Sequence, residues 1–242
     1  MAKEEPRNTQ ELGKSGVKML TIVENLAADS TDVYLYDVIG EGFFGDGISA
    51  KTFSDQIKAI KTKNINLRIN SPGGNALEGF AMYNALKGKK AHIVVDIDGA
   101  ALSAASFIAM AGDEVRIAKN AFVMIHDPST MVAGNAAEMR KTAELLDKVR
   151  DNIVQSYVDK SKRNAQTFVD AMAVETWYTA QEAIDAGLAD RITDFAGVAA
   201  CYQAPWVRIP QRIADIFTPS AEEIKECDEL KARIQSLKGL TL

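Results

Sequence analysis

The stretch DGAALSAASFIAMAGD, from Asp98 to Asp113, contains almost no large side chain before Phe107. The run HIVVDID that leads into it is typical of a buried strand, and the residues after Ser103 are typical of an apolar helix. Ser103 is therefore predicted at a strand-to-helix junction, where free N–H groups and the helix dipole favour a developing oxyanion. Two interpretations stay open at this point. The small residues allow close helix–sheet packing with Ser103 as a helix cap, or they allow a substrate to approach Ser103.

Strands and helices alternate along the chain on both sides of this junction, which predicts an α/β protein with a parallel sheet and crossover connections. The predicted strands cover residues 33–40, 65–70, 91–98, 114–118, 122–126 and 188–193. Besides the helix after Ser103, the predicted helices cover residues 49–61, 76–87, 135–163 and 179–187. The helix over 135–163 is long for a globular protein, so we expect it to project from the domain.

The sequence divides into three parts. Residues 1–17 are polar and charged and are predicted to form a flexible arm, and residues 18–194 carry the alternating pattern of the main domain. Residues 195–242 are an extension in which Ser220 and Glu223 have the spacing of a capping box, which predicts a terminal helix after Ser220.

Composition excludes several classes of protein. The 242 residues are 47% hydrophobic and 25% charged, which is typical of a globular protein with a sizeable core. The formal net charge of -5 argues against a nucleic-acid partner, and no apolar run approaches the roughly 18 residues of a membrane span. The N-terminus lacks the pattern of a secretory signal, and Cys201 and Cys227 have no metal or redox spacing. We therefore expect a cytoplasmic protein that binds no metal, no cofactor and no membrane.

Few residues could serve as a catalytic base, because the chain has only two histidines. His92 begins an apolar strand with no polar cluster around it and is interpreted as structural. His126 ends the predicted strand FVMIH and faces a turn, a place where catalytic groups are common. The turn SPGG, residues 71–74, also joins a strand to a helix, and its glycines expose N–H groups. A serine, a histidine and a glycine turn at one sheet end supply a nucleophile, a base and oxyanion donors for acyl transfer.

Four motifs occur in an order that resembles the Clp-type serine peptidases of the ClpP/crotonase fold. They are INSPGG, GAALSAASFIAMAG, VMIHDPS and ETWYTAQEAIDAGLAD, and the resemblance covers residues 33–194. It implies repeated β-β-α units with a long projecting helix, and makes residues 18–194 a ClpP-like peptidase domain. The segments GEGFFGDGISAKTF, AGDEVRIAKNAFVMIHDPS and ETWYTA are most similar to the phage and prophage head maturation proteases.

The resemblance implies a role for each matching position. The family's nucleophile falls on Ser103 and its general base on His126, while Ser106 falls on a small helix position behind the nucleophile. The oxyanion donors fall on the backbone N–H groups of Gly74 and Ala104.

The third member of the triad falls on Glu175, four residues before Thr179. The better-known housekeeping enzymes have an aspartate there, so a glutamate is a departure from their pattern. Asp127 is the rival, although its position next to His126 in the chain makes a well-aligned contact between the two side chains harder.

The resemblance implies a serine endopeptidase that acts on a protein or peptide substrate, with capsid or scaffold protein as the substrate during phage head assembly. It also implies a ring-shaped homo-oligomer in the cytoplasm of a bacterium or of a phage-infected host. No axial-gate segment of the housekeeping enzymes is recognised in residues 1–32, so a proteolytic subunit working with a Clp ATPase is the alternative. An acyl-CoA enzyme of the crotonase type and an inactive structural ring are alternatives from other classes.

Overall fold

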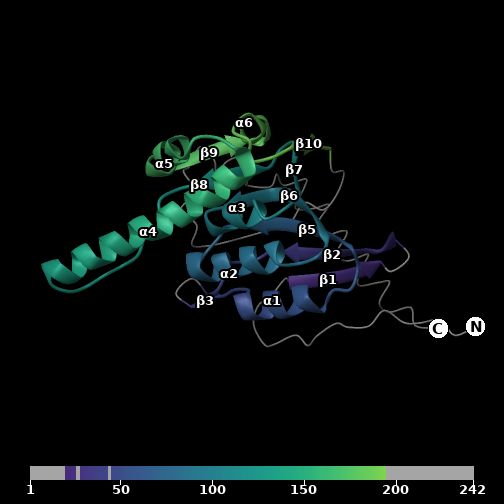
Figure 1. Cartoon of the computed structure of the whole chain (residues 1–242), viewed down its shortest axis with the longest axis horizontal. Coiled ribbons are helices and arrows are strands. Elements are labelled where there is room, and N and C mark those ends of the chain that lie inside the picture. The colour runs from purple at the N-terminus through teal and green to yellow at the C-terminus, as the bar shows by residue number, and fades with distance from the viewer. Residues whose placement is uncertain (1–19, 26–27, 43–44, 195–242) are drawn as a thin grey trace, which may run out of the picture.

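The computed structural model describes residues 20–25, 28–42 and 45–194 (Figure 1). Within these residues the chain forms an eight-stranded mixed sheet, a short two-stranded ribbon and six α-helices. The predicted arm over 1–17 and the predicted extension over 195–242, with its terminal helix, lie outside the described residues.

The main sheet runs in the order β1-β2-β5-β6-β7-β10. These strands are β1 (Leu20–Asn25), β2 (Ser30–Leu35), β5 (Asn64–Ser71), β6 (His92–Leu102), β7 (Glu114–Ala118) and β10 (Arg191–Thr193). All neighbours in this order pair in parallel except β1 and β2. The far end of β6 pairs in parallel with β8 (Phe122–Ile125), which pairs antiparallel with β9 (Thr176–Thr179). A separate short ribbon consists of β3 (Glu41–Gly42) and β4 (Gly45–Asp46).

The helices are α1 (Ala50–Ala59), α2 (Ala76–Lys87), α3 (Ala104–Ala109), α4 (Ala136–Ser161), α5 (Ala165–Ala173) and α6 (Ala180–Asp185). Their starts follow from capping residues in the sequence: Ser49 caps α1, Asn75 caps α2, and Thr179 and Glu182 form a capping box on α6. Figure 1 shows α1 and α2 over one face of the sheet and α4 extending beyond it.

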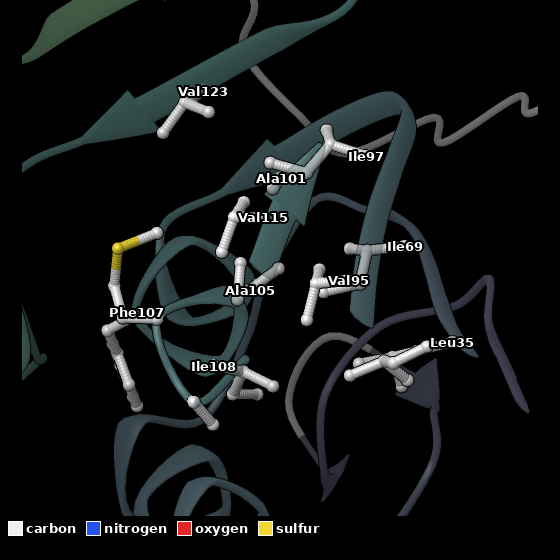
Figure 2. Close-up of a cluster of buried hydrophobic side chains, with 14 of the residues drawn as sticks. Leu35, Ile69, Val95, Ile97, Ala101, Ala105, Phe107, Ile108, Val115 and Val123 are labelled. Atoms are coloured by element: carbon white, nitrogen blue, oxygen red, sulfur yellow. The ribbon is translucent and has the colours of Figure 1, made fainter. Parts of the chain in front are cut away.

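The core lies between the apolar face of the sheet and the helices that cover it. Alternate residues of β2, β5, β6 and β7 are fully buried on this face, as the period of a half-buried strand requires. Figure 2 shows this cluster, in which side chains of α3 lie among those of the central strands. Its labelled members are Leu35, Ile69, Val95, Ile97, Ala101, Ala105, Phe107, Ile108, Val115 and Val123. The small residues around Ser103 therefore do pack closely, as the first interpretation of that stretch requires.

The expected α/β fold and the projecting helix are confirmed. The local predictions were incomplete in four places. The first described strand, β1, was not predicted, and the second begins at Ser30 rather than at Val33. The motif ETWYTA, residues 175–180, contains the whole of β9, which was not predicted as a strand, and α5 was not predicted either. These elements are short, and their apolar positions show too few repeats to separate strand from helix by period.

Candidate active site

Ser103 stands alone between β6, which ends at Leu102, and α3, which begins at Ala104. Its backbone has φ 52° and ψ -121°, a conformation that normally requires glycine because a Cβ atom is crowded there. Its side chain makes no capping hydrogen bond to α3. The helix-cap interpretation of Ser103 is therefore wrong, and the strained turn instead presents the hydroxyl at the sheet end.

His126 reaches Ser103 because of the register between β6 and β8. Leu102 pairs with Met124 in this parallel ladder, and the Ser103 N–H donates to the Met124 carbonyl at 2.9 Å. His126 follows the last residue of β8, and its Nε2 lies 2.7 Å from Ser103 Oγ. With the proton on Nδ1, the ring accepts a hydrogen bond from the serine hydroxyl, which is the geometry of a general base beside a nucleophile.

The environment of His126 favours its neutral form. Burial lowers the pKa of His126 below its ordinary value, and this effect exceeds the opposing influence of two carboxylates. Of these, Glu175 raises the pKa of His126 more than Asp127 does. A lowered pKa widens the pH range over which the imidazole is neutral and can accept a proton.

The SPGG turn lies directly against the Ser103 junction. A Cβ atom on Gly73 would lie 2.4 Å from the Leu102 carbonyl oxygen and 2.8 Å from Ala104 N, so only glycine allows this approach. Gly74 has φ 148°, and a Cβ atom there would lie 2.2 Å from the Ile39 carbonyl oxygen. The bonds from Ile39 N to the Gly73 carbonyl and from Asn75 N to the Ile39 carbonyl brace the turn from its other side.

The two backbone N–H groups expected to bind an oxyanion come from these neighbouring turns. Gly74 and Ala104 donate no hydrogen bond to any other part of the chain that the structure describes. Ala104 is the first residue of α3, where an N–H has no partner inside the helix. The arrangement leaves two donors near Ser103 available to a ligand.

Glu175 lies beside His126 but is not hydrogen-bonded to it. Ile125 pairs with Thr176 in the antiparallel β8–β9 ladder, so continuing the ladder by one residue sets Glu175 opposite His126. The exposed Glu175 carboxylate instead accepts a hydrogen bond from Trp177 Nε1 at 3.1 Å. Like Ser103, Glu175 has a positive φ, 51°. The sequence pattern does not indicate that Trp177 would compete with His126 for the Glu175 carboxylate.

Asp127 is the second carboxylate near the imidazole. It is half-buried, and its Oδ1 is buried without a hydrogen-bond partner among the described residues. Its backbone N–H donates to the Met172 carbonyl, which ties the residue after His126 to α5. The structure therefore brings both candidates for the third position to His126 without joining either to the ring.

Other candidates can be placed as well. His92 is at the opposite end of β6 from Ser103, with Nδ1 3.4 Å from Asp113, so it takes no part in this site. In the described ranges, no three His, Cys, Asp or Glu side chains are grouped to hold a metal ion. None of the described helices is both long and apolar enough to cross a membrane.

Comparison with known proteins places the site in context. The family model described as Clp protease matches residues 17–195. The ATP-dependent Clp protease proteolytic subunit 1 of Protochlamydia amoebophila is 27% identical over 198 residues, which are 79% of this chain and 95% of that protein. The ATP-dependent Clp protease proteolytic subunit of Ligilactobacillus salivarius is 34% identical over 132 residues, 54% of this chain and 67% of that protein.

A solved structure has the same fold. A mutant of ClpP1 from Listeria monocytogenes superposes with a TM-score of 0.59 at 22% identity, covering 68% of this chain and 91% of that chain. At this identity the likeness concerns the fold alone, and the chemistry rests on the arrangement of side chains described above.

Proposed function

Because the chain belongs to the Clp protease family, we propose that it is a serine endopeptidase with residues 18–194 as its peptidase domain and Ser103 as its nucleophile. The observation that carries this proposal is the 2.7 Å contact between His126 Nε2 and Ser103 Oγ at the strained end of β6. Two unused N–H donors beside a serine–histidine pair are what acyl transfer requires.

In the proposed reaction the same groups act twice, first when the acyl-enzyme forms and again when water hydrolyses it. Ser103 Oγ attacks the peptide carbonyl carbon while its proton passes to His126 Nε2. The oxyanion of the tetrahedral intermediate is bound by the N–H groups of Gly74 and Ala104. His126 then gives the proton to the leaving amine, an acyl-enzyme remains on Ser103, and a water activated by His126 hydrolyses it.

Glu175 is proposed as the third member of the triad. Its charge already raises the pKa of His126, and the ladder between β8 and β9 sets it opposite the ring. To accept a hydrogen bond from His126 Nδ1, its carboxylate must leave Trp177, and we propose that it does so by rotation of the side chain. The acidic group then fixes the tautomer of the ring and stabilises the imidazolium.

The names of the relatives favour a Clp proteolytic subunit over a head maturation protease as the biological role. Both relatives described above are ATP-dependent Clp protease proteolytic subunits, which supports a Clp ATPase as a partner of this chain too. Maturation of phage capsid or scaffold protein is the second candidate, and it rests on the similarity of residues 40–53, 111–129 and 175–180 to that branch. Degradation of a folded protein only when a Clp ATPase and ATP are added supports the first role, and cleavage of capsid protein without them supports the second.

The reaction class is tested by offering two substrates to the purified chain. We expect hydrolysis of fluorogenic peptides and no turnover of an acyl-CoA thioester. Turnover of the thioester without peptide hydrolysis would favour an enzyme of the crotonase type, and inertness toward both would favour a structural ring.

The pH dependence of peptide hydrolysis follows from the setting of His126. Only neutral His126 accepts the serine proton, and burial lowers its pKa, so the acid limb of kcat/KM is expected below the ordinary pKa of about 6.5. Removing a neighbouring negative charge lowers the pKa of His126 further. The limb should therefore move to lower pH in Glu175→Gln, and less far in Asp127→Asn. A limb that moves upward in Glu175→Gln would contradict this electrostatic account.

The exposed apolar residues of α4 and the loop before it support a homo-oligomer, proposed as a ring. Met131 is 76% exposed, Leu145 is 58% exposed, and Met139 lies on the same projecting segment (Figure 1). Grouped apolar exposure of this kind is typical of an interface between subunits. We expect Leu145→Glu to shift the protein to smaller species in size-exclusion chromatography with light scattering. The control Val23→Glu, on β1, should not, and a wild-type monomer at micromolar concentration would overturn the proposal.

A further inference from the structure

Two buried hydroxyl groups form a hydrogen-bonded series that ends on the Ser103 carbonyl, whereas His126 contacts the Ser103 side chain. Ser106 on α3 and Tyr157 on α4 are 0% and 1% exposed, so neither meets solvent. Ser106 Oγ lies 2.5 Å from the Ser103 carbonyl oxygen and 2.7 Å from the Tyr157 hydroxyl oxygen. None of the roles assigned above uses either side chain.

The direction of each hydrogen bond in this series of hydroxyl groups is fixed. A carbonyl oxygen can only accept, so the Ser106 hydroxyl must donate its single proton to Ser103. Ser106 Oγ is then left as an acceptor, and the Tyr157 hydroxyl must donate to it. Burial raises the pKa of Tyr157 above its ordinary value, so this hydroxyl keeps its proton. The Ser106 N–H also donates to the Ser103 carbonyl at 3.0 Å.

The carbonyl held in this way belongs to the same peptide unit as the Ala104 N–H. A trans peptide is planar, and its C=O and N–H point in opposite directions. Holding the Ser103 oxygen toward Ser106 therefore directs the Ala104 N–H away from Ser106. The restraint is needed because Ser103 has a backbone conformation that a serine rarely adopts, with φ 52°. A rotation of this peptide would relax the strain and turn the N–H away from a bound oxyanion.

Resting on the proposed function, we propose that Ser106 and Tyr157 are positioning residues that keep the Ala104 N–H directed at the oxyanion of the tetrahedral intermediate. Charge on that oxygen develops only after Ser103 attacks, so the pair acts on the transition state more than on the bound substrate. The proposal therefore predicts an effect on kcat and on tetrahedral adducts, with little effect on KM.

The chain supplies a matched control for this test. The Tyr83 side chain on α2 lies close to Ser156, the residue before Tyr157 on α4, and Ser156 Oγ donates to the Asn152 carbonyl at 3.4 Å. This second pair also joins α4 to a neighbouring helix through a tyrosine and a serine. It does not contact the Ser103–Ala104 peptide, so its loss reports on helix packing alone.

The experiment compares Ser106→Ala, Tyr157→Phe and their combination with Tyr83→Phe and Ser156→Ala. For each we would measure kcat and KM on a fluorogenic peptide, the melting temperature, and the affinity for a peptide boronate. Ser103 Oγ adds to boron in this inhibitor, its proton passes to His126, and the adduct mimics the tetrahedral intermediate. We expect Ser106→Ala to lower both kcat and boronate affinity by about tenfold, the effect of one buried hydrogen bond, with KM unchanged.

The other variants separate positioning from a loss of stability. Tyr157→Phe should lower kcat by less than Ser106→Ala, because Ser106 can still donate to Ser103. The double variant should match Ser106→Ala in kcat, because Tyr157 acts through Ser106. Tyr83→Phe and Ser156→Ala should lower the melting temperature to a similar extent while leaving kcat and boronate affinity unchanged.

Two kinds of failure are distinguishable. If the wild-type protein hydrolyses peptides while Ser106→Ala and Tyr157→Phe keep wild-type kcat and boronate affinity, the positioning role is wrong and the proposed function stands. If kcat falls only in step with the melting temperature in all four single variants, the role is also wrong. If the wild-type protein neither hydrolyses peptides nor binds the boronate, the proposed function fails and this inference fails with it.

Discussion

Replacement of Ser103 by alanine is expected to lower peptide hydrolysis by on the order of 10⁴-fold or more, because the reaction loses its only nucleophile. The protein should stay folded, since the Ser103 side chain contributes no capping bond to α3. Steady-state kinetics on a fluorogenic peptide, together with circular dichroism, would check both statements.

Two further variants of this region sharpen the test. Ser103→Gly should be equally inactive but more stable by about 1 kcal/mol in chemical denaturation, because glycine adopts this backbone conformation without strain. Ser106→Ala should retain far more activity than either. Near-normal turnover in Ser103→Ala combined with loss of activity in Ser106→Ala would mean that the serines have been assigned in the wrong order.

Glu175→Gln is expected to lower kcat by roughly 10²-fold or more, with little change in KM or in melting temperature. The variant lacks the carboxylate that fixes the tautomer of His126 and stabilises the imidazolium that forms when Ser103 gives up its proton. Stability should change little because the Glu175 side chain is exposed. Glu175→Asp should retain part of the activity, because a carboxylate remains at the same position but on a shorter side chain.

Trp177 and Asp127 supply the controls for this prediction. Trp177→Phe removes the indole N–H that holds the Glu175 carboxylate, so kcat should remain at the wild-type level or rise. Asp127→Asn should be milder than Glu175→Gln, because the Asp127 charge influences the pKa of His126 less. An unchanged kcat in Glu175→Gln together with a severe loss of kcat in Asp127→Asn would assign the third position of the triad to Asp127.

The junction at Ser103 could be predicted from the sequence because it depends on order along the chain. An apolar strand, a small-residue turn and an apolar helix follow one another between residues 92 and 110. The position of His126 at a strand end followed from the same pattern. Its distance from Ser103 did not, because that depends on the pairing of Leu102 with Met124, a register between strands that a single sequence does not specify.

The setting of Glu175 and the series of hydroxyl groups at the Ser103 carbonyl lay beyond sequence reasoning for a related cause. Glu175 is set opposite His126 by the antiparallel pairing of β9 with β8, and its carboxylate accepts a hydrogen bond from Trp177 rather than from the ring. Tyr157 follows Ile153 by four residues on α4, a spacing that by itself indicates only a packing residue. Only the crossing of α4 behind α3 brings its hydroxyl to Ser106. The placement of Glu175 and of Tyr157 depends on contacts between segments that are distant in the sequence, so local sequence patterns do not predict it.

Activation of the Ser103 nucleophile by His126 can be measured directly with a fluorophosphonate, which reacts with activated serines. The protein is treated with a fluorophosphonate, digested, and analysed by mass spectrometry to locate the modified residue. We expect phosphonylation of Ser103 alone in the wild-type protein, and loss of that labelling in both Ser103→Ala and His126→Ala. Labelling of another serine, or unchanged labelling of Ser103 in His126→Ala, would contradict the assignment of Ser103 as the nucleophile and His126 as its base.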